Sequence, residues 1–300
     1  MTITRRKFCR EVTLTGTALS LLPAWQSVYA GTEALPTRSI PGSGLELPVV
    51  GLGNSNAFRE GDVSASMDLI GLLHEHGGSY VDCIGDSRFI VAEAARSLGI
   101  EQDLFLGSYF SDEDETANKA DADRLLAITG KSQLDVMTSF PEFAIPNWSL
   151  FRRWKDEGLT RFIGIARHRS EYYESMMELM ETGTVDLIQV NYSPLETEAD
   201  QEILPMALDK GIAVTINRPF INGEYFSLVR GHNVPDWASD FDCDNWAAFS
   251  IKFILSHPAV TCVLTETANP KHARQNLSAG LGRLPDEKTR QRMVGYLRNL

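Results

Sequence analysis

Polar side chains that can hold or transfer a proton follow several short apolar runs of this 300-residue chain. Asp82 ends the run SYVD, Tyr109 ends LFLGSY, and His168 follows RFIGIAR. An aspartate can act as a general base, and a tyrosine as a general acid, when neighbouring groups tune their pKa values. Cys83 is expected to be a poor nucleophile, because the adjacent Asp82 charge disfavours its thiolate. Proton transfer is therefore the chemistry that these positions suggest.

Each of these residues also has a purely structural explanation. Asp82 could serve only to hydrogen-bond Tyr109 or a backbone amide, and Tyr109 could simply fill space with its ring. His168 has no nearby nucleophile in the sequence, which favours an incidental histidine. Trp148 and Trp154 have helical spacing and are expected to pack rather than to bind a substrate. The spatial arrangement must decide between these alternatives.

Composition and motifs exclude several classes of function. The sequence has no group of His, Asp and Glu with metal-ligand spacing, no G-x-S-x-G and no early G-x-G-x-x-G, so we expect no metal and no Rossmann domain. A formal net charge of −12 argues against nucleic acid or an anionic membrane as a partner. A small molecule or a protein remains as the expected partner.

Three apolar runs within residues 160–220 show how the polar positions are held. The runs FIGIA, LIQV and IAVTI lack polar alternation, which is typical of strands buried on both faces. Spacers with helical periodicity separate them and end at Gly183 and Gly211, which are suited to helix C-caps. This pattern predicts parallel strands joined by helices.

The same alternation continues over residues 31–300 and predicts one α/β domain, a TIM (β/α)8 barrel. Five further strand candidates are PVVGLGNSN, SYVDCIGD, LFLGSYF, LDVMTSFP and VTCVLTET. The other expected helices cover 64–77, 89–98, 120–129, 147–158, 244–257, 270–279 and 286–299. Residues 32–50 are expected to form a surface strand or hairpin, the acidic segment after Phe110 a solvated loop, and 221–243 an irregular lid or binding loop.

The first 30 residues resemble a twin-arginine export signal. Arg5 and Arg6 precede Phe8, a short apolar segment follows, and a small-residue sequence ends at Ala30. This resemblance predicts an exported, periplasmic protein without a membrane span in its mature form.

The cysteines do not suggest a disulfide framework. Without Cys9, the mature chain would contain Cys83, Cys243 and Cys262, an odd number. Two of these lie in strand-like runs, so we expect buried free thiols.

Seven segments in order resemble the aldo/keto reductase family over roughly residues 40–280. They are LPVVGLG, SYVDCIG, RFIGIA, DLIQVNYSPLE, LPMALDKGIAVTINRPF, FILSHPAVTCVL and NPKHARQNLSAG. The resemblance implies a (β/α)8 barrel that reduces carbonyls with NAD(P)H through an Asp, Tyr, Lys and His tetrad. In such a tetrad the tyrosine protonates the carbonyl oxygen, and the lysine lowers the tyrosine pKa.

Carried over residue by residue, the resemblance retains only the tetrad aspartate, Asp82. The tyrosine position holds Ser87, the threonine-lysine position holds Ser108-Tyr109, and the histidine position holds Phe140, or Ser139 if the register slips by one. A positioned general acid contributes about 10²- to 10⁴-fold in rate, so we expect this chain not to be a standard carbonyl reductase.

The resemblance also implies cofactor contacts. The expected residues are Gln189, Asn217, Arg218, Gln275 and Asn276.

Three of the positions expected around the cofactor depart from the family pattern. Ala166-Arg167 replaces a serine-asparagine pair, Asn217 replaces a stacking aromatic, and Glu266 lies where a phosphate is bound. A carboxylate there repels the 2′-phosphate of NADP unless Lys271 or Arg274 compensates, so NADH, bound weakly, is the expected nucleotide if one binds at all.

Three hypotheses follow. The first is an exported aldo/keto reductase-like binding or accessory protein with a degenerate reductase site. The second is an NAD(P)H-dependent oxidoreductase in which Asp82, Tyr109 or Arg218 supplies non-standard acid chemistry on a small carbonyl compound. The third is a non-redox lyase or isomerase with Asp82 as its base.

Overall fold

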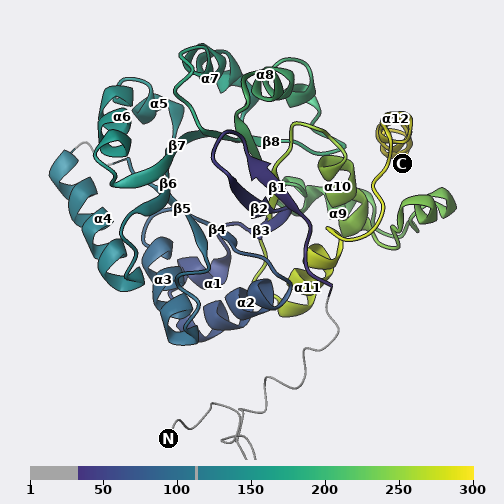
Figure 1. The fold of residues 1–300 in the computed structure, drawn as a ribbon. Coiled ribbons are helices and arrows are strands. Elements are labelled where there is room, and N and C mark those ends of the chain that lie inside the picture. The colour runs from purple at the N-terminus through teal and green to yellow at the C-terminus, as the bar shows by residue number, and fades with distance from the viewer. Residues whose placement is uncertain (1–32, 112–113) are drawn as a thin grey trace, which may run out of the picture. The chain divides into compact units, whose positions relative to one another are not determined.

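The structure is a computed structural model that describes residues 33–111 and 114–300 (Figure 1). The predicted export signal over residues 1–30 lies outside the described residues, so it stays a prediction. In the described part of the chain, no helix combines the length and apolar character that crossing a membrane would require.

Eight parallel strands close into a barrel, which confirms the predicted TIM (β/α)8 fold. The strands, in chain order, are β3 (Val50–Leu52), β4 (Tyr80–Cys83), β5 (Phe105–Tyr109), β6 (Leu134–Ser139), β7 (Thr160–Ala166), β8 (Leu187–Asn191), β9 (Ala213–Asn217) and β10 (Cys262–Thr265). Each pairs with its sequence neighbour, and β10 pairs with both β9 and β3 to close the ring. Figure 1 shows this ring enclosed by helices.

Helices connect the strands and cover the outside of the barrel. They are α1 (Asn56–Arg59), α2 (Val63–Glu75), α3 (Ser87–Leu98), α4 (Glu115–Thr129), α5 (Pro141–Ala144), α6 (Trp148–Asp156), α7 (Tyr173–Met180), α8 (Ile203–Lys210), α9 (Glu224–Leu228), α10 (Trp246–Leu255), α11 (Pro270–Ser278) and α12 (Glu287–Leu297). Short 3₁₀ turns lie at Ser170–Tyr172, Glu198–Asp200, Ile221–Gly223 and Asp236–Phe241.

Three local predictions need correction. Helix α4 begins at Glu115 rather than at residue 120, because Asp114 caps it and an acidic first turn suits the helix dipole. Helix α7 ends at Met180, so Gly183 is not its C-cap, whereas Gly211 caps α8 in the left-handed conformation as predicted. Residues 221–243 are not an irregular loop, since they contain α9 and two 3₁₀ turns.

The predicted hairpin is present and closes one end of the barrel. Strands β1 (Thr37–Ile40) and β2 (Leu45–Pro48) pair antiparallel and lie across the amino-terminal end of the ring (Figure 1). Ile40 and Leu47 are buried there against the lowest layer of side chains inside the barrel, which includes Phe105 and Phe162. Ligand access from this end is therefore blocked by packed apolar side chains.

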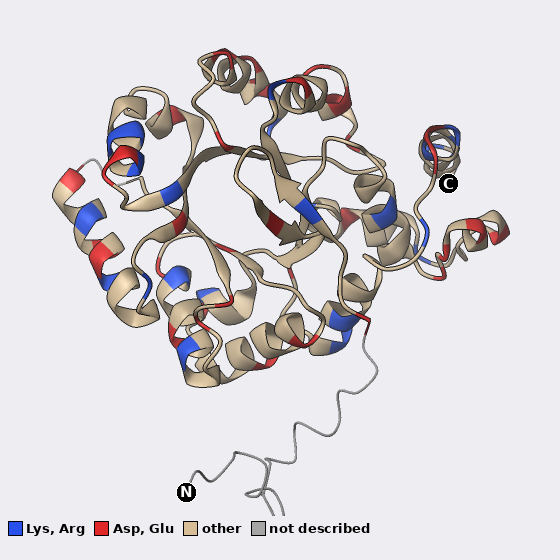
Figure 2. Ribbon diagram, viewed as in Figure 1, with Lys and Arg blue, Asp and Glu red and all other residues tan. Residues whose placement is uncertain are grey.

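Side-chain packing confirms two further predictions. Trp148 and Trp154 are buried, and their neighbour Phe151 packs against both rings at 5.6 and 6.0 Å between centroids. Cys83, Cys243 and Cys262 are free and buried. Figure 2 shows acidic and basic residues interspersed over the outer helices, as expected for a solvated surface.

Candidate functional site

A cavity of about 190 Å³ lies at the carboxyl-terminal end of the barrel strands. Its lining combines strand-end residues predicted from the sequence with residues from the following loops: Asn54, Asp82, Ile84, Tyr109, Phe140, Ala166, Arg167, His168, Gln189, Asn217, Arg218, Asn222 and Glu266. We call this cavity the mouth. Active sites of (β/α)8 barrels lie at this end, because each strand directs its last side chains towards the following loop.

Asp82 is the buried acid of the mouth. Its side chain is 3% exposed, and its Oδ1 atom has no hydrogen-bond partner. Burial raises the pKa of Asp82 to about 7; Gln189 and Tyr109 act in the opposite direction, and the Glu266 charge raises the pKa further. A carboxyl group with this pKa can both donate and accept a proton near neutral pH.

Gly107 on the neighbouring strand gives Asp82 its space. A Cβ at Gly107 would overlap Asp82 Oδ1 and would press on the ring and hydroxyl of Tyr80. The buried carboxyl thus depends on a glycine directly beside it in the sheet, where Asp82 and Gly107 are register partners.

Tyr109 belongs to a buried hydrogen-bond network. Its hydroxyl donates to Oε1 of Gln189 at 3.1 Å, and Nδ2 of Asn217 donates to the same oxygen at 3.1 Å. Nε2 of Gln189 and Oδ1 of Asn217 have no partner. Buried polar atoms are normally paired, so these orphaned groups indicate a site that a polar ligand or water completes.

The acidity of Tyr109 is the opposite of what carbonyl protonation requires. Burial raises its pKa well above the ordinary value, and the Asp82 charge raises it further. In the described residues that line the mouth there is no lysine to lower it. Tyr109 therefore fits a hydrogen-bonding role better than that of a proton donor.

Two of the positions that the resemblance assigns to the tetrad differ in their distance from the mouth. Ser87 is buried in the first turn of α3 and does not line the mouth. Phe140, not Ser139, occupies the mouth after β6, and its ring packs on Tyr109 at 5.3 Å between centroids. An apolar ring therefore lines the mouth at one of the two positions, Phe140 and Ser139, that the resemblance offers for the tetrad histidine.

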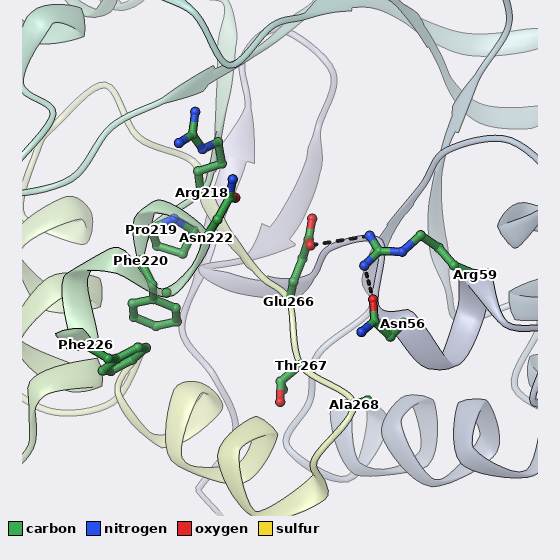
Figure 3. A pocket seen from close by; sticks show the side chains of 11 residues that line it. Asn56, Arg59, Arg218, Pro219, Phe220, Asn222, Phe226, Glu266, Thr267 and Ala268 are labelled. Carbon is green, nitrogen blue, oxygen red and sulfur yellow. Dashed lines mark hydrogen bonds and ion pairs between the residues drawn. The ribbon is translucent and has the colours of Figure 1, made fainter.

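Two further cavities extend the mouth into a groove. One, of about 550 Å³, shares Arg218, Asn222 and Glu266 with the mouth (Figure 3). The next, of about 320 Å³, shares Phe220, Phe226, Glu266 and Thr267 with the first and ends at Gln275 and Asn276. The predicted cofactor residues therefore lie at the two ends of one groove. Gln275 and Asn276 lie at the far end, and Gln189, Asn217 and Arg218 lie at the mouth.

Sequence reasoning missed an aromatic wall of this groove. Phe220 and Phe226 lie 4.8 Å apart between ring centroids, and Phe226 is 40% exposed (Figure 3). Trp246 lines the same far cavity. The run of aromatics in NRPFINGEYF was the available signal, but it did not show that the rings share one cavity.

Glu266 occupies the centre of the groove. It lies between the Arg218–Asn222 pair and Arg59 in Figure 3, and Arg59 is its ion-pair partner at 3.8 Å. Burial of the carboxyl group in the groove raises its pKa, which Arg59 counteracts. Among the described residues, neither Lys271 nor Arg274 lines the three cavities.

The connection after β9 has a strained backbone. Arg218, Ile221 and Asn222 have φ values of 50°, 50° and 53°, in the left-handed region that non-glycine residues seldom adopt. Each such residue costs of order 1 kcal/mol or more, and strain of this kind gathers at functional sites. Here it places Arg218 and Asn222 on the wall shared by the mouth and the groove.

The described residues fit a metal poorly and a dinucleotide in part. No group of three His, Cys, Asp or Glu side chains suited to a metal ion occurs in the described chain. The unpartnered amide groups of Gln189 and Asn217 and the groove as far as Asn276 fit a nucleotide cofactor. The Glu266 carboxyl at the centre fits the additional 2′-phosphate of NADP poorly, because like charges repel.

Solved structures share the fold of this chain. An aldo-keto reductase from Bacillus halodurans in its holo form superposes with a TM-score of 0.71 and 18% identity, covering 88% of this chain and 96% of that one. An aldo/keto reductase from Klebsiella pneumoniae in complex with NADP and acetate gives a TM-score of 0.64 and 17% identity, covering 89% and 95%. At these identities the likeness concerns the fold.

Sequence comparison identifies the family. A 103-residue segment is 30% identical to an NADH-specific methylglyoxal reductase of Escherichia coli strain K12, covering 33% of this chain and only 31% of that protein. The model of the aldo/keto reductase family matches residues 120–292, which is more than half of the chain. The chain therefore belongs to the aldo/keto reductase family.

Proposed function

We propose that this chain is a ligand-binding member of its family, in which the mouth holds a small polar molecule but the standard carbonyl-reducing tetrad is lost. One observation supports this proposal above all. The mouth keeps buried, unpartnered polar atoms on Asp82, Gln189 and Asn217. The family resemblance, for its part, assigns Ser87 and Phe140 to the tyrosine and histidine positions of the tetrad. A buried polar group without a partner lowers the stability of the fold. Because such a cost is typically found at functional sites, these groups support the binding of a ligand.

A nucleotide titration tests this proposal. The mature chain, residues 31–300, is titrated with NADH and with NADPH while energy transfer from tryptophan to the nicotinamide is recorded, because Trp246 lines the groove. The binding-protein proposal expects no saturable signal with NADPH and none, or only a weak one, with NADH. Micromolar binding of either nucleotide together with turnover would contradict it.

A second candidate is an NADH-dependent oxidoreductase with non-standard acid chemistry. The pKa of about 7 on Asp82 favours it, because a carboxyl group that is half protonated at neutral pH can replace a missing phenolic acid. A bound nicotinamide would supply the hydride, and the contribution of this chain would be the proton on Asp82. Turnover of a carbonyl compound that disappears in Asp82→Asn but persists in Tyr109→Phe would support this candidate.

The export prediction forms part of the proposal. Folded proteins travel by the twin-arginine route, so the groove would be complete before export. Cell fractionation of the full-length chain, compared with a variant carrying Arg5→Lys and Arg6→Lys, tests it. We expect the wild type in the periplasm and the variant in the cytoplasm; equal distributions would contradict export by this route.

A further inference from the structure

We propose that the mouth binds a short carboxylate-bearing molecule, with its anionic group held between Arg167 and Arg218. This inference rests on the proposed ligand-binding function and narrows it to one chemical class. The two arginines follow β7 and β9, which lie on either side of β8 in the barrel, and both line the mouth of a chain with a net charge of −12. Their guanidinium groups are matched in shape to a carboxylate.

Arg167 is held rigidly. Its guanidinium lies over the rings of Phe140 and Tyr172, at 5.0 and 4.5 Å from the ring centroids, and one terminal nitrogen contacts Glu142 at 2.5 Å. Its side chain is 16% exposed, and its Nε atom is buried without a partner. Cation–π contacts fix the group in place and leave a donor unused.

Arg218 is placed by a strained backbone. Its φ of 50° directs the side chain from the end of β9 into the wall of the mouth. Its ion pair with Glu196 is long, at 3.8 Å, and its bond to the carbonyl oxygen of His168 is also long, at 3.4 Å. Its Nε is buried and unpartnered. A guanidinium whose terminal nitrogens have only long contacts, on a side chain that is 23% exposed, can turn those nitrogens to a ligand.

The surroundings select an anion on this side of the mouth. Burial lowers the pKa of His168, and the charges of Arg218 and Arg167 lower it further, so the arginines supply the positive charge there. Asp82 and Tyr109 line the same cavity and offer an acceptor or donor to a hydroxyl or carbonyl oxygen. A ligand that satisfies both sets is a hydroxy- or oxo-carboxylate.

The volume limits the size of the ligand. Sites for drug-sized molecules usually measure about 300–1,000 Å³, whereas the mouth measures about 190 Å³. The ligand is therefore an acid of a few carbons. A larger anion would have to extend past the Glu266 carboxyl group, which lies on the wall that the mouth shares with the groove.

Matched ligands test the inference on the mature wild-type chain. Isothermal titration calorimetry compares lactate and pyruvate with lactamide, which keeps the shape and lacks the charge, and with inorganic phosphate. We expect lactate or pyruvate to bind at least about tenfold more tightly than lactamide and phosphate, because paired charge-assisted hydrogen bonds are lost with the uncharged amide.

Variants assign the binding to the two arginines. Arg167→Gln and Arg218→Gln should each weaken carboxylate binding by about tenfold or more. Arg167→Lys and Arg218→Lys keep the charge but lose the fork, and should give smaller losses. Arg169→Gln is the matched control, since Arg169 is exposed, pairs with Glu171 and does not line the mouth; its affinity should equal that of the wild type.

The outcomes separate this inference from the proposed function. Equal binding of lactate and lactamide, tighter binding of phosphate, or carboxylate binding unchanged in both glutamine variants would overturn the anionic site and leave ligand binding at the mouth standing. If none of these ligands binds, the carboxylate inference is overturned as well. The proposed function fails on a different result, micromolar binding of NADH or NADPH together with turnover, so the two failures are distinguishable.

Discussion

The two ends of the barrel are built in opposite ways. At the amino-terminal end the β1–β2 hairpin lies over a layer of apolar side chains, in which Phe105 packs against Tyr80 at 5.1 Å and Phe162 at 6.1 Å between ring centroids. At the carboxyl-terminal end, one oxygen of a buried carboxyl group and one atom in each of several side-chain amides lack a hydrogen-bond partner. One end is arranged for stability, and the other gives up stability for a polar cavity.

Tyr80 connects these two regions. Its ring belongs to the apolar layer, while its hydroxyl lies near Asp82 beside Gly107 and has no hydrogen-bond partner of normal geometry. Burial and the Asp82 charge raise its pKa well above the ordinary value. The boundary between the apolar end and the polar end therefore lies within β4, between Tyr80 and Asp82.

The largest effect is expected at the closed end. Phe105→Ala removes a buried ring and should lower the free energy of unfolding by about 3–5 kcal/mol, measured by denaturant titration. Ligand binding at the mouth should be unchanged. Phe226→Ala, in an exposed wall of the groove, is the control and should cost less than about 1 kcal/mol. Similar costs for both variants would remove the contrast between the two regions.

The next effect concerns Asp82 and depends on pH. In the folded chain Asp82 keeps its proton up to about pH 7, whereas in the unfolded chain it loses it near its ordinary value of 3.8. The folded state binds more protons between these values, so stability falls as pH rises through this window. Asp82→Asn should therefore raise the free energy of unfolding at pH 8 by about 2–4 kcal/mol.

The same variant supplies its own control at low pH. Near pH 4 the wild-type carboxyl is protonated in the folded state, so the two proteins should differ by less than about 1 kcal/mol. Chemical unfolding at both pH values measures the difference. A variant that is less stable than the wild type at pH 8 would show that Asp82 is ionised and well paired, contrary to the account.

A smaller effect is expected at Tyr109. Tyr109→Phe removes the hydrogen bond to Gln189 and should cost about 1 kcal/mol, because Asn217 still donates to the same oxygen. The hydroxyl also lowers the pKa of Asp82, so its loss should move the pH-dependent fall in stability to higher pH. If the pH dependence of the free energy of unfolding is unchanged in this variant, the Tyr109 hydroxyl does not influence the pKa of Asp82.

The smallest effect is expected at the centre of the groove. Glu266→Gln removes a negative charge from the position where nucleotide phosphates would lie, and should raise the affinity for NADH about threefold. Fluorescence titration of wild type and variant measures it, with Glu93→Gln, an exposed residue outside all three cavities, as the control for a general charge effect. Equal gains from both variants would show that net charge alone controls binding.

The sequence predicted the barrel and most strand ends because both depend on local periodicity. Runs such as FIGIA and LIQV are buried on both faces and appear in the structure as β7 and β8, and Asp82, Tyr109 and Gln189 meet as expected from parallel strand ends. The assignment of Ser87 and Phe140 to tetrad positions rests on motif spacing and stays a prediction.

The remaining parts of the site depend on non-local geometry. The positive φ angles of Arg218 and Asn222, and the stacking of Arg167 on Phe140 and Tyr172, arise from tertiary contacts that no local pattern encodes. The first turn of α4 is acidic and lacks apolar periodicity, so the sequence pattern predicts a loop there. Asp114, a favourable N-cap, is the local signal for the earlier start of the helix.

The central claim is that the polar mouth persists without the proton relay of a carbonyl reductase. Steady-state reduction of methylglyoxal by the purified mature chain, with NADH and with NADPH, tests it against a reductase that carries the complete tetrad. The account predicts turnover at least about 10²-fold slower than that reductase, because the positioned acid is absent. Turnover within tenfold of it, abolished by Asp82→Asn, would contradict the account.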